Sequence, residues 1–109
     1  MPSAGIAKRY ASRVQILKAL AHPTRLFLVE TLAEGERCVC ELTDSVGDDM
    51  STVSKHLTVL REAGVLASER RGQQIFYQLR VPCVLDVFSC IEEVLGAERS
   101  GAPSCAIRN

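Results

Sequence analysis

The chain has no tryptophan, and aromatic residues make up only 5% of its 109 residues. Aromatic side chains commonly line the pockets that bind small organic substrates, so a substrate pocket is poorly supported. Only two histidines are present, and no set of serine, histidine and carboxylate suggests nucleophilic catalysis. We therefore expect a protein that is not an enzyme and that requires no cofactor.

Long hydrophobic runs are also absent, since no stretch approaches the roughly 18 apolar residues of a membrane span. Residues 1–10 lack the apolar segment of a secretory signal, so we expect a cytoplasmic protein without a membrane partner. The five cysteines should stay reduced in that compartment, and their odd number fits poorly with a fully paired disulfide framework. Metal or metalloid binding, redox sensing and simple burial are the roles left open for them.

Net charge is zero, with 13 basic and 13 acidic residues, which by itself argues mildly against a nucleic-acid partner. The distribution of charge is more informative. Residues 51–80 carry an excess of three positive charges, whereas residues 1–50 and 81–109 are each slightly negative. A positive field is therefore concentrated in one segment, as a nucleic-acid-binding element requires.

Apolar spacing and turn residues predict mainly helical structure with one small β-hairpin. Pro23 suits the first turn of a helix, while Gly35, Gly47 and Gly64 suit helix ends. Helices are expected at about 10–21, 23–34, 39–46, from the Asp48–Ser51 caps to 63, and 82–96, with hairpin strands at 65–70 and 74–79. We predict a winged helix-turn-helix domain over residues 1–96 and a mobile C-terminal tail over residues 97–109.

The fourth helix has the pattern of a DNA-recognition helix. Burying Val53, Leu57 and Leu60 would turn short hydroxyl side chains and one cation outward, and such groups contact bases or phosphates. Arginines at the hairpin turn could reach phosphates. The alternatives are a solvated helix face and a charged turn without a partner, and His56 is expected to be a packed, hydrogen-bonded residue. The predicted DNA-binding residues are Ser51, Thr52, Ser54, Lys55, Thr58, Arg70 and Arg71.

Two thiols one residue apart, Cys38 and Cys40, lie just before this predicted recognition helix. Thiolates select soft ions, and a helix N-terminus together with Arg37 would favour the thiolate form. On a regular helix the two side chains would point roughly 200° apart, so binding one ion would unwind the first turn and shift the recognition helix. Burial as small core residues is the alternative role for either cysteine.

Three segments together resemble the arsenic-resistance repressors of the ArsR/SmtB winged-helix family over residues 14–95. They are Leu20-Ala21-His22-Pro23-Thr24-Arg25-Leu26, Cys38-Val39-Cys40-Glu41-Leu42, and Ser54-Lys55-His56-Leu57 followed by Leu60-Arg61-Glu62-Ala63-Gly64-Val65-Leu66. The resemblance implies a homodimer on a palindromic operator, with the first and last helices at the dimer interface and an inducer that releases the DNA.

This sequence departs from the arsenic repressors at one ligand position. Many of them carry a third cysteine three residues after the second, where this chain has Thr43. Cys83, Cys90 or Cys105 would have to supply a third thiolate, although burial at the dimer interface suits Cys83 and Cys90 better. Two thiolates would suffice for methylarsenite, in which carbon already occupies one arsenic bond. The family's zinc site on the last helix is not supported, because that helix has no histidine.

From these observations we predict a metalloid-responsive repressor that is released from DNA when trivalent arsenic or antimony binds Cys38 and Cys40, with Cys105 as the candidate third ligand. The alternatives are a cysteine-based redox sensor and a cadmium- or lead-responsive repressor on the same fold.

Overall fold

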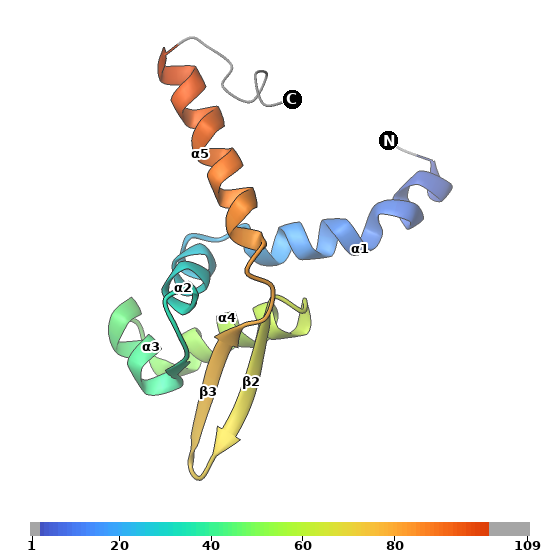
Figure 1. Ribbon diagram of the computed structural model, residues 1–109. Helices are drawn as coiled ribbons and strands as arrows, with labels where there is room; N and C mark the ends of the chain where they lie inside the picture. Colours follow the sequence, from blue (N-terminus) through green and yellow to red (C-terminus); the bar gives the residue numbers. More distant parts are fainter. Residues whose placement is uncertain (1–2, 101–109) are drawn as a thin grey trace.

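A computed structural model describes residues 3–100 and contains five helices and a three-stranded antiparallel sheet (Figure 1). The elements, in chain order, are α1 (Ala4–Leu20), α2 (Pro23–Ala33), β1 (Arg37–Cys38), α3 (Val39–Val46), α4 (Met50–Glu62), β2 (Leu66–Arg71), β3 (Gln74–Leu79) and α5 (Val84–Ser100). The predicted fold class, mainly helical with a small hairpin wing, is confirmed. None of the helices within residues 3–100 combines the length and hydropathy needed to cross a membrane.

The core lies among α2, α3, α4 and the base of the hairpin. Leu28, Leu42, Leu57, Leu60 and Leu66 are almost completely buried there, and no charged or polar side chain of the described chain is buried with them. Helix α4 contributes Val53, Leu57 and Leu60, which is the inward set that the sequence predicts. The opposite side of α4 is therefore left for solvent or a partner.

Local chemistry explains the helix-turn-helix. Gly47 ends α3 in the left-handed conformation with a φ of 80°, which glycine adopts without steric cost. Asp49 then caps α4, because its Oδ1 accepts the Thr52 backbone N–H at 2.9 Å. The turn between α3 and α4 is only three residues long, so the two helices pack directly against each other.

The wing is the β2–β3 hairpin, in which Arg71 pairs with Gln74 across a turn at Gly72. The strand β1 adds to the other side of β3, with Arg37 opposite Tyr77 and Cys38 opposite Phe76. Sequence reasoning did not predict β1, because two residues are too few to show an alternating pattern. Because of this strand, the segment that contains Cys38 is joined to the wing by backbone hydrogen bonds.

Two helices are longer than the sequence predicts. Helix α1 begins at Ala4 rather than near Tyr10, because the Ser3 hydroxyl accepts the Ile6 backbone N–H and caps an earlier turn. Helix α5 continues past Gly96 to Ser100, since a single internal glycine costs only about 1 kcal/mol and good helix formers follow it. The rest of the expected tail, residues 101–109, lies outside the described residues.

Helix α1 and the second half of α5 extend from the body as two separate arms (Figure 1). Each arm exposes apolar side chains that the chain itself does not cover. The expected apolar face of α5 is divided, because Val84 is buried and Leu85 and Phe88 pack against the core. The exposed apolar residues of the arms are Ile6, Tyr10, Val14, Ile16, Leu17, Val87, Ile91, Val94 and Leu95.

Candidate nucleic-acid interface and thiol site

The outward face of α4 is arranged as the sequence predicts. Ser51 and Lys55 are exposed, and Thr58 is half-buried one turn farther along the helix. Thr52 and Ser54 are half-buried on the flanks. These side chains offer hydroxyl groups and one cation on a helix whose other side is anchored in the core, so α4 can enter a groove without unfolding.

Part of this hydroxyl set is engaged by the helix cap. Hydrogen bonds from the Thr52 hydroxyl and backbone N–H, followed by one from Ser51 and by the charge of Lys55, lower the pKa of Asp49. The Asp49 carboxylate is therefore anionic at neutral pH. Thr52 and Ser51 thus stabilise the start of the helix, and Lys55 is the cation of this face.

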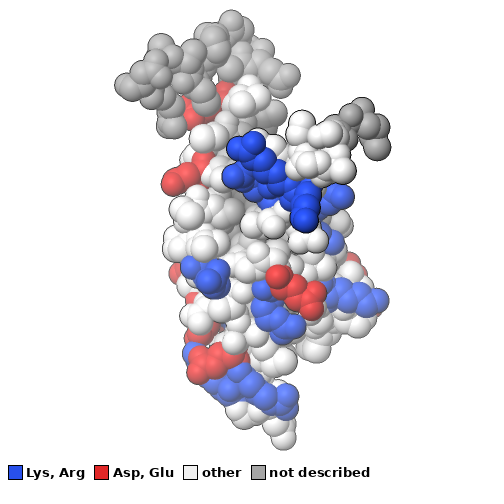
Figure 2. All heavy atoms as spheres, turned by 90° about the vertical axis from the view of Figure 1, so that its right-hand side faces the viewer, with Lys and Arg blue, Asp and Glu red and all other residues white. Residues whose placement is uncertain are grey.

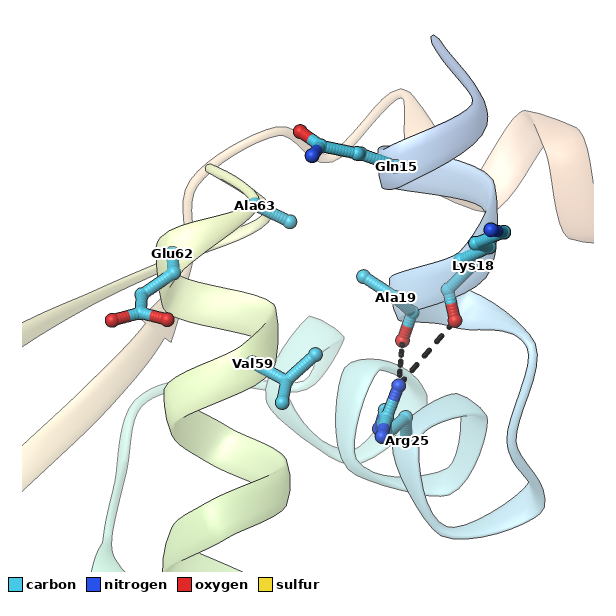
Figure 3. Close-up of a pocket in the computed structure, with 7 residues that line it drawn as sticks. All are labelled: Gln15, Lys18, Ala19, Arg25, Val59, Glu62 and Ala63. Atoms are coloured by element: carbon cyan, nitrogen blue, oxygen red, sulfur yellow. Dashed lines mark hydrogen bonds between the residues drawn. The ribbon is translucent and has the colours of Figure 1, made fainter. Parts of the chain in front are cut away.

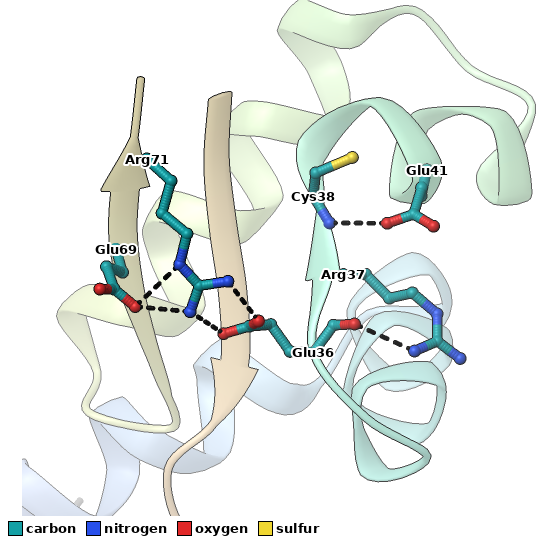
Figure 4. Close-up of polar contacts among 6 residues, drawn as sticks. All are labelled: Glu36, Arg37, Cys38, Glu41, Glu69 and Arg71. Carbon is teal, nitrogen blue, oxygen red and sulfur yellow. Dashed lines mark hydrogen bonds and ion pairs between the residues drawn. The ribbon is translucent and has the colours of Figure 1, made fainter. Parts of the chain in front are cut away.

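At the wing, Arg71 lies within a cluster of acidic and aromatic groups (Figure 4). Its two terminal nitrogens donate to the two carboxylate oxygens of Glu36 at 2.7 Å each, and Nη2 also donates to Glu69 at 2.7 Å. The guanidinium lies 4.6 Å from the centroid of the Phe76 ring. The bonds to Glu36 and then Glu69 raise the pKa of Arg71. Arg71 can therefore bind a phosphate only if the phosphate replaces one of its carboxylate partners.

Arg70 differs from Arg71 because it forms no ion pair within residues 3–100, although its Nε donates to the Gly72 carbonyl at 3.2 Å. On the face shown in Figure 2, basic side chains gather on α1 and again toward the wing, where acidic side chains lie beside them. The positive charge that the sequence assigns to residues 51–80 is thus partly neutralised at the wing.

Contrary to the prediction from the sequence, the two thiols do not lie on one regular helix. Cys38 is the last residue of β1 and the residue that precedes α3, with an extended backbone (φ −81°, ψ 161°). Cys40 is in the first turn of α3 and is exposed, whereas Cys38 is only 7% exposed. The expected separation of two helical side chains does not apply, so the inference that an ion must unwind α3 loses its basis.

The charged group hydrogen-bonded to Cys38 is Glu41 (Figure 4). Glu41 Oε1 accepts the Cys38 backbone N–H at 3.0 Å, and this bond, followed by one from the Cys38 side chain, lowers the pKa of Glu41. Arg37 instead donates to the Glu36 carbonyl at 3.0 Å and pairs with Glu34 at 3.7 Å. Arg37 is thus engaged with Glu34 and the Glu36 carbonyl, and the Glu41 carboxylate organises the start of α3.

Cys38 and Cys40 both line a pocket of about 180 Å³, which we call the thiol pocket. Its other walls come from α3, α4 and the end of the wing. The full lining is Cys38, Val39, Cys40, Met50, Ser54, Gln73, Gln74 and Ile75. The pocket therefore lies between the thiol pair and the two elements predicted to contact DNA.

Sequence reasoning missed Met50, Gln73 and Gln74, because they reach this pocket from two segments that are far apart in the chain, the start of α4 and the hairpin turn of the wing. No group of three histidine, cysteine or acidic side chains able to hold a metal occurs among residues 3–100. Cys83 and Cys90 are exposed and do not line the pocket. The candidate third ligand Cys105 lies outside the described residues.

Arg25 holds three helices together on another side of α4 (Figure 3). Its Nε donates to His56 Nδ1 at 3.2 Å, and its Nη1 donates to the carbonyls of Ala19 at 3.3 Å and Lys18 at 3.4 Å. This confirms His56 as a packed, hydrogen-bonded residue. A pocket of about 370 Å³ lies beside Arg25, lined by Gln15, Lys18, Ala19, Arg25, Val59, Glu62 and Ala63.

We predict that His56 titrates below 6.5. Burial lowers its pKa most, and the neighbouring His22 and Arg25 lower it further. Because the unfolded chain takes up this proton at higher pH than the folded one, stability should fall as the pH drops below 6.5. An NMR titration of the imidazole signals, assigned with His56→Gln, measures the pKa. In urea unfolding the native protein should lose more stability between pH 7.5 and 5.5 than His56→Gln, and a His56 pKa at or above 6.5 would refute the assignment.

Comparison with known proteins gives a consistent set of matches. The family model described as bacterial regulatory protein, arsR family, matches residues 22–68. A biofilm growth-associated repressor of Xylella fastidiosa is 47% identical over 72 residues, which are 66% of this chain and 63% of that protein. The chain thus matches less than two thirds of that relative's length.

Two solved structures extend the comparison to the fold. The crystal structure of Rv0081 from Mycobacterium tuberculosis superposes with a TM-score of 0.74 at 35% identity, covering 84% of this chain and 93% of that one. The solution structure of the homodimeric winged helix-turn-helix domain of Mb0332 from Mycobacterium bovis has a TM-score of 0.74 at 26% identity, with coverage of 92% and 93%. The arrangement of five helices and a wing is therefore shared with DNA-binding regulators.

Proposed function

Because the chain belongs to the ArsR family of bacterial regulatory proteins, we propose that it is a transcriptional repressor that trivalent arsenic or antimony releases from DNA by binding Cys38 and Cys40. One observation carries this proposal. Both thiols line a single pocket whose remaining walls belong to α3, the recognition helix α4 and the wing. An ion held there contacts the DNA-binding elements directly.

The DNA-binding half of the proposal is supported by exposed groups on two elements. Ser51 and Lys55 lie on the outward face of α4, and Arg70 lies near the hairpin turn of the wing. A helix in the major groove flanked by a basic hairpin on the backbone combines base contacts with phosphate contacts.

The proposed DNA-binding unit is a homodimer. The apolar side chains exposed on α1 and the second half of α5 would be covered if two copies packed these arms together, and uncovered apolar patches of this kind mark interaction surfaces. The related Mycobacterium bovis domain is homodimeric. Two copies of α4 would then face two half-sites of a palindromic operator.

Release follows from differential affinity. An ion that binds the thiol pocket more tightly in the DNA-free conformation shifts the protein off DNA by that difference, and a factor of about 100 requires only about 2.7 kcal/mol. Two thiolates suffice for methylarsenite, whereas arsenite would use a third donor such as Cys105. The alternative inducers, cadmium and lead, would use the same soft ligands.

A cysteine redox sensor is the second candidate function. It would require Cys38 or Cys40 to pair with another thiol on oxidation, and the four described cysteines are free thiols. Cys38 and Cys40 are the described thiols that line the pocket, which favours ion binding by this pair. Stoichiometric metalloid binding under reducing conditions separates the two candidates.

For DNA binding, we predict that Lys55→Ala weakens operator affinity by about tenfold or more, a loss of about 1.4 kcal/mol, because a contact in the groove is removed. Arg71→Ala should lower affinity for all sequences and reduce the salt dependence by about one charge per subunit. Fluorescence anisotropy over a salt series measures both effects. Lys8→Ala, on the distant arm α1, is the matched control, and unchanged isotherms for Lys55→Ala and Arg71→Ala would reject this interface.

For assembly, we expect Ile91→Asp and Leu95→Asp to give monomers, because each places a charge on the apolar arm of α5 without disturbing the core. Phe88 is a poorer probe, since it packs against the core of its own chain. Sedimentation at micromolar concentration reports the mass. Ser89→Asp places the same charge elsewhere on α5 and should remain dimeric, and a monomeric native protein would exclude the proposed assembly.

For induction, Cys38→Ser and Cys40→Ser should each retain operator binding and lose release by arsenite, antimonite and methylarsenite, because a single thiolate cannot form the chelate. Cys90→Ser, which changes an exposed thiol on α5, should respond like the native protein. Anisotropy of a promoter fragment under reducing conditions follows the release. If arsenite still releases the double variant Cys38→Ser/Cys40→Ser, the sensor lies elsewhere.

A further inference from the structure

The thiol pocket contains a third sulfur that the proposed function does not use. Met50 is the first residue of α4, and its side chain lines the pocket together with Cys38 and Cys40. It is 48% exposed and does not belong to the hydrophobic core. Core packing therefore does not account for this side chain at this position.

A thioether that lines the same pocket as two thiols defines a particular ligand chemistry. Methionine sulfur is neutral, soft and polarisable, and sets of thiolate and thioether ligands select copper(I). Trivalent arsenic instead completes its bonding with thiolate or carbon. We propose that Cys38, Cys40 and Met50 form a three-sulfur site for a soft monovalent cation, copper(I).

The surroundings of the pocket fit such a site. Val39 and Ile75 supply apolar walls. The polar side chains of the lining, Ser54, Gln73 and Gln74, offer only harder oxygen and nitrogen donors, which copper(I) disfavours relative to sulfur. Met50 has three rotatable side-chain bonds beyond the backbone, so its sulfur can move to the ion without moving α4. Cys38 and Cys40 each release one proton to solvent when they bind, so copper(I) replaces two protons and no electron is transferred.

The position of Met50 also connects the ion to DNA binding. Cys40 is in the first turn of α3 and Met50 is in the first turn of α4, so one ion would join the starts of the two helices of the helix-turn-helix. The inference rests on the proposed function in one respect, because Cys38 and Cys40 must both be ligands. It is independent of whether arsenic is an inducer.

The first test uses the scarcity of methionine, since the chain has only Met1 and Met50. Protein labelled with ¹³C at the methionine methyl groups is titrated anaerobically with one equivalent of copper(I), and Met50→Leu assigns the signals. The Met50 methyl signal should shift or broaden until one equivalent is bound, with the Met1 signal as internal reference. No change at Met50 while copper(I) binds would overturn the proposal.

The second test measures affinity by competition with a chromophoric copper(I) chelator. Met50→Leu keeps the size and apolar character of the side chain and should weaken copper(I) binding by about tenfold or more, which corresponds to about 1.4 kcal/mol. Val87→Leu, which changes an exposed apolar residue of α5 outside the pocket, should bind copper(I) like the native protein. An equal affinity of Met50→Leu and the native protein would show that two thiolates hold copper(I) alone and would reject Met50 as a ligand.

Arsenite separates this inference from the proposed function. Met50→Leu should keep the native response of the DNA complex to arsenite and methylarsenite, because arsenic does not use the thioether. If Met50→Leu binds copper(I) like the native protein and the native protein still responds to arsenicals, only the three-sulfur site is rejected. Absence of both copper(I) and arsenical binding in the native protein would reject the proposed function itself, and with it this inference.

Discussion

The pairing of β1 with β3 is the constraint on which the arrangement of the site depends. Cys38 is paired with Phe76 in the sheet, and it is also the residue from which α3 begins. Because one residue has both positions, the start of α3 and the wing cannot move independently at this point. Glu36, two residues earlier, adds two bonds of 2.7 Å that reach past β3 to Arg71 on β2. The thiol segment is therefore fastened to the wing by backbone and side-chain bonds.

The buried contacts of α3 and α4 complete this connection. Leu42 of α3 and Leu57 of α4 are both fully buried in one core, so a displacement of the start of α3 is resisted by close packing. Under the proposed function, coupling between ligand and DNA would need no long pathway, since the pocket is lined by residues of α4 and the wing. An occupant of the thiol pocket acts on groups that are themselves part of the proposed DNA-binding surface.

Sequence reasoning succeeds where the cause is local. The ends of α3 and α4 follow from Gly47 and Asp49, and the buried side of α4 follows from the spacing of its apolar residues. It fails where partners are distant in the chain, since Glu36 and Arg71 are separated by 35 residues. The two-residue strand β1 has no periodicity to detect, and without it the spacing of Cys38 and Cys40 predicts two neighbours on one helix. The sequence does not single out Met50, because nothing in its neighbours indicates that it lines the same pocket as the thiols.

The ion pairs of the wing change the electrostatic argument for DNA binding. The excess positive charge of residues 51–80 does not include Glu36. This carboxylate lies outside that segment and forms an ion pair with Arg71. A phosphate that binds Arg71 must replace the bidentate bonds from Glu36, which are stronger than those of an ordinary exposed ion pair. That exchange would free the carboxylate two residues before Cys38 from the wing. Under the proposed function, DNA and Glu36 would therefore compete for the Arg71 guanidinium, which would give the wing a direct part in coupling DNA to the thiol segment.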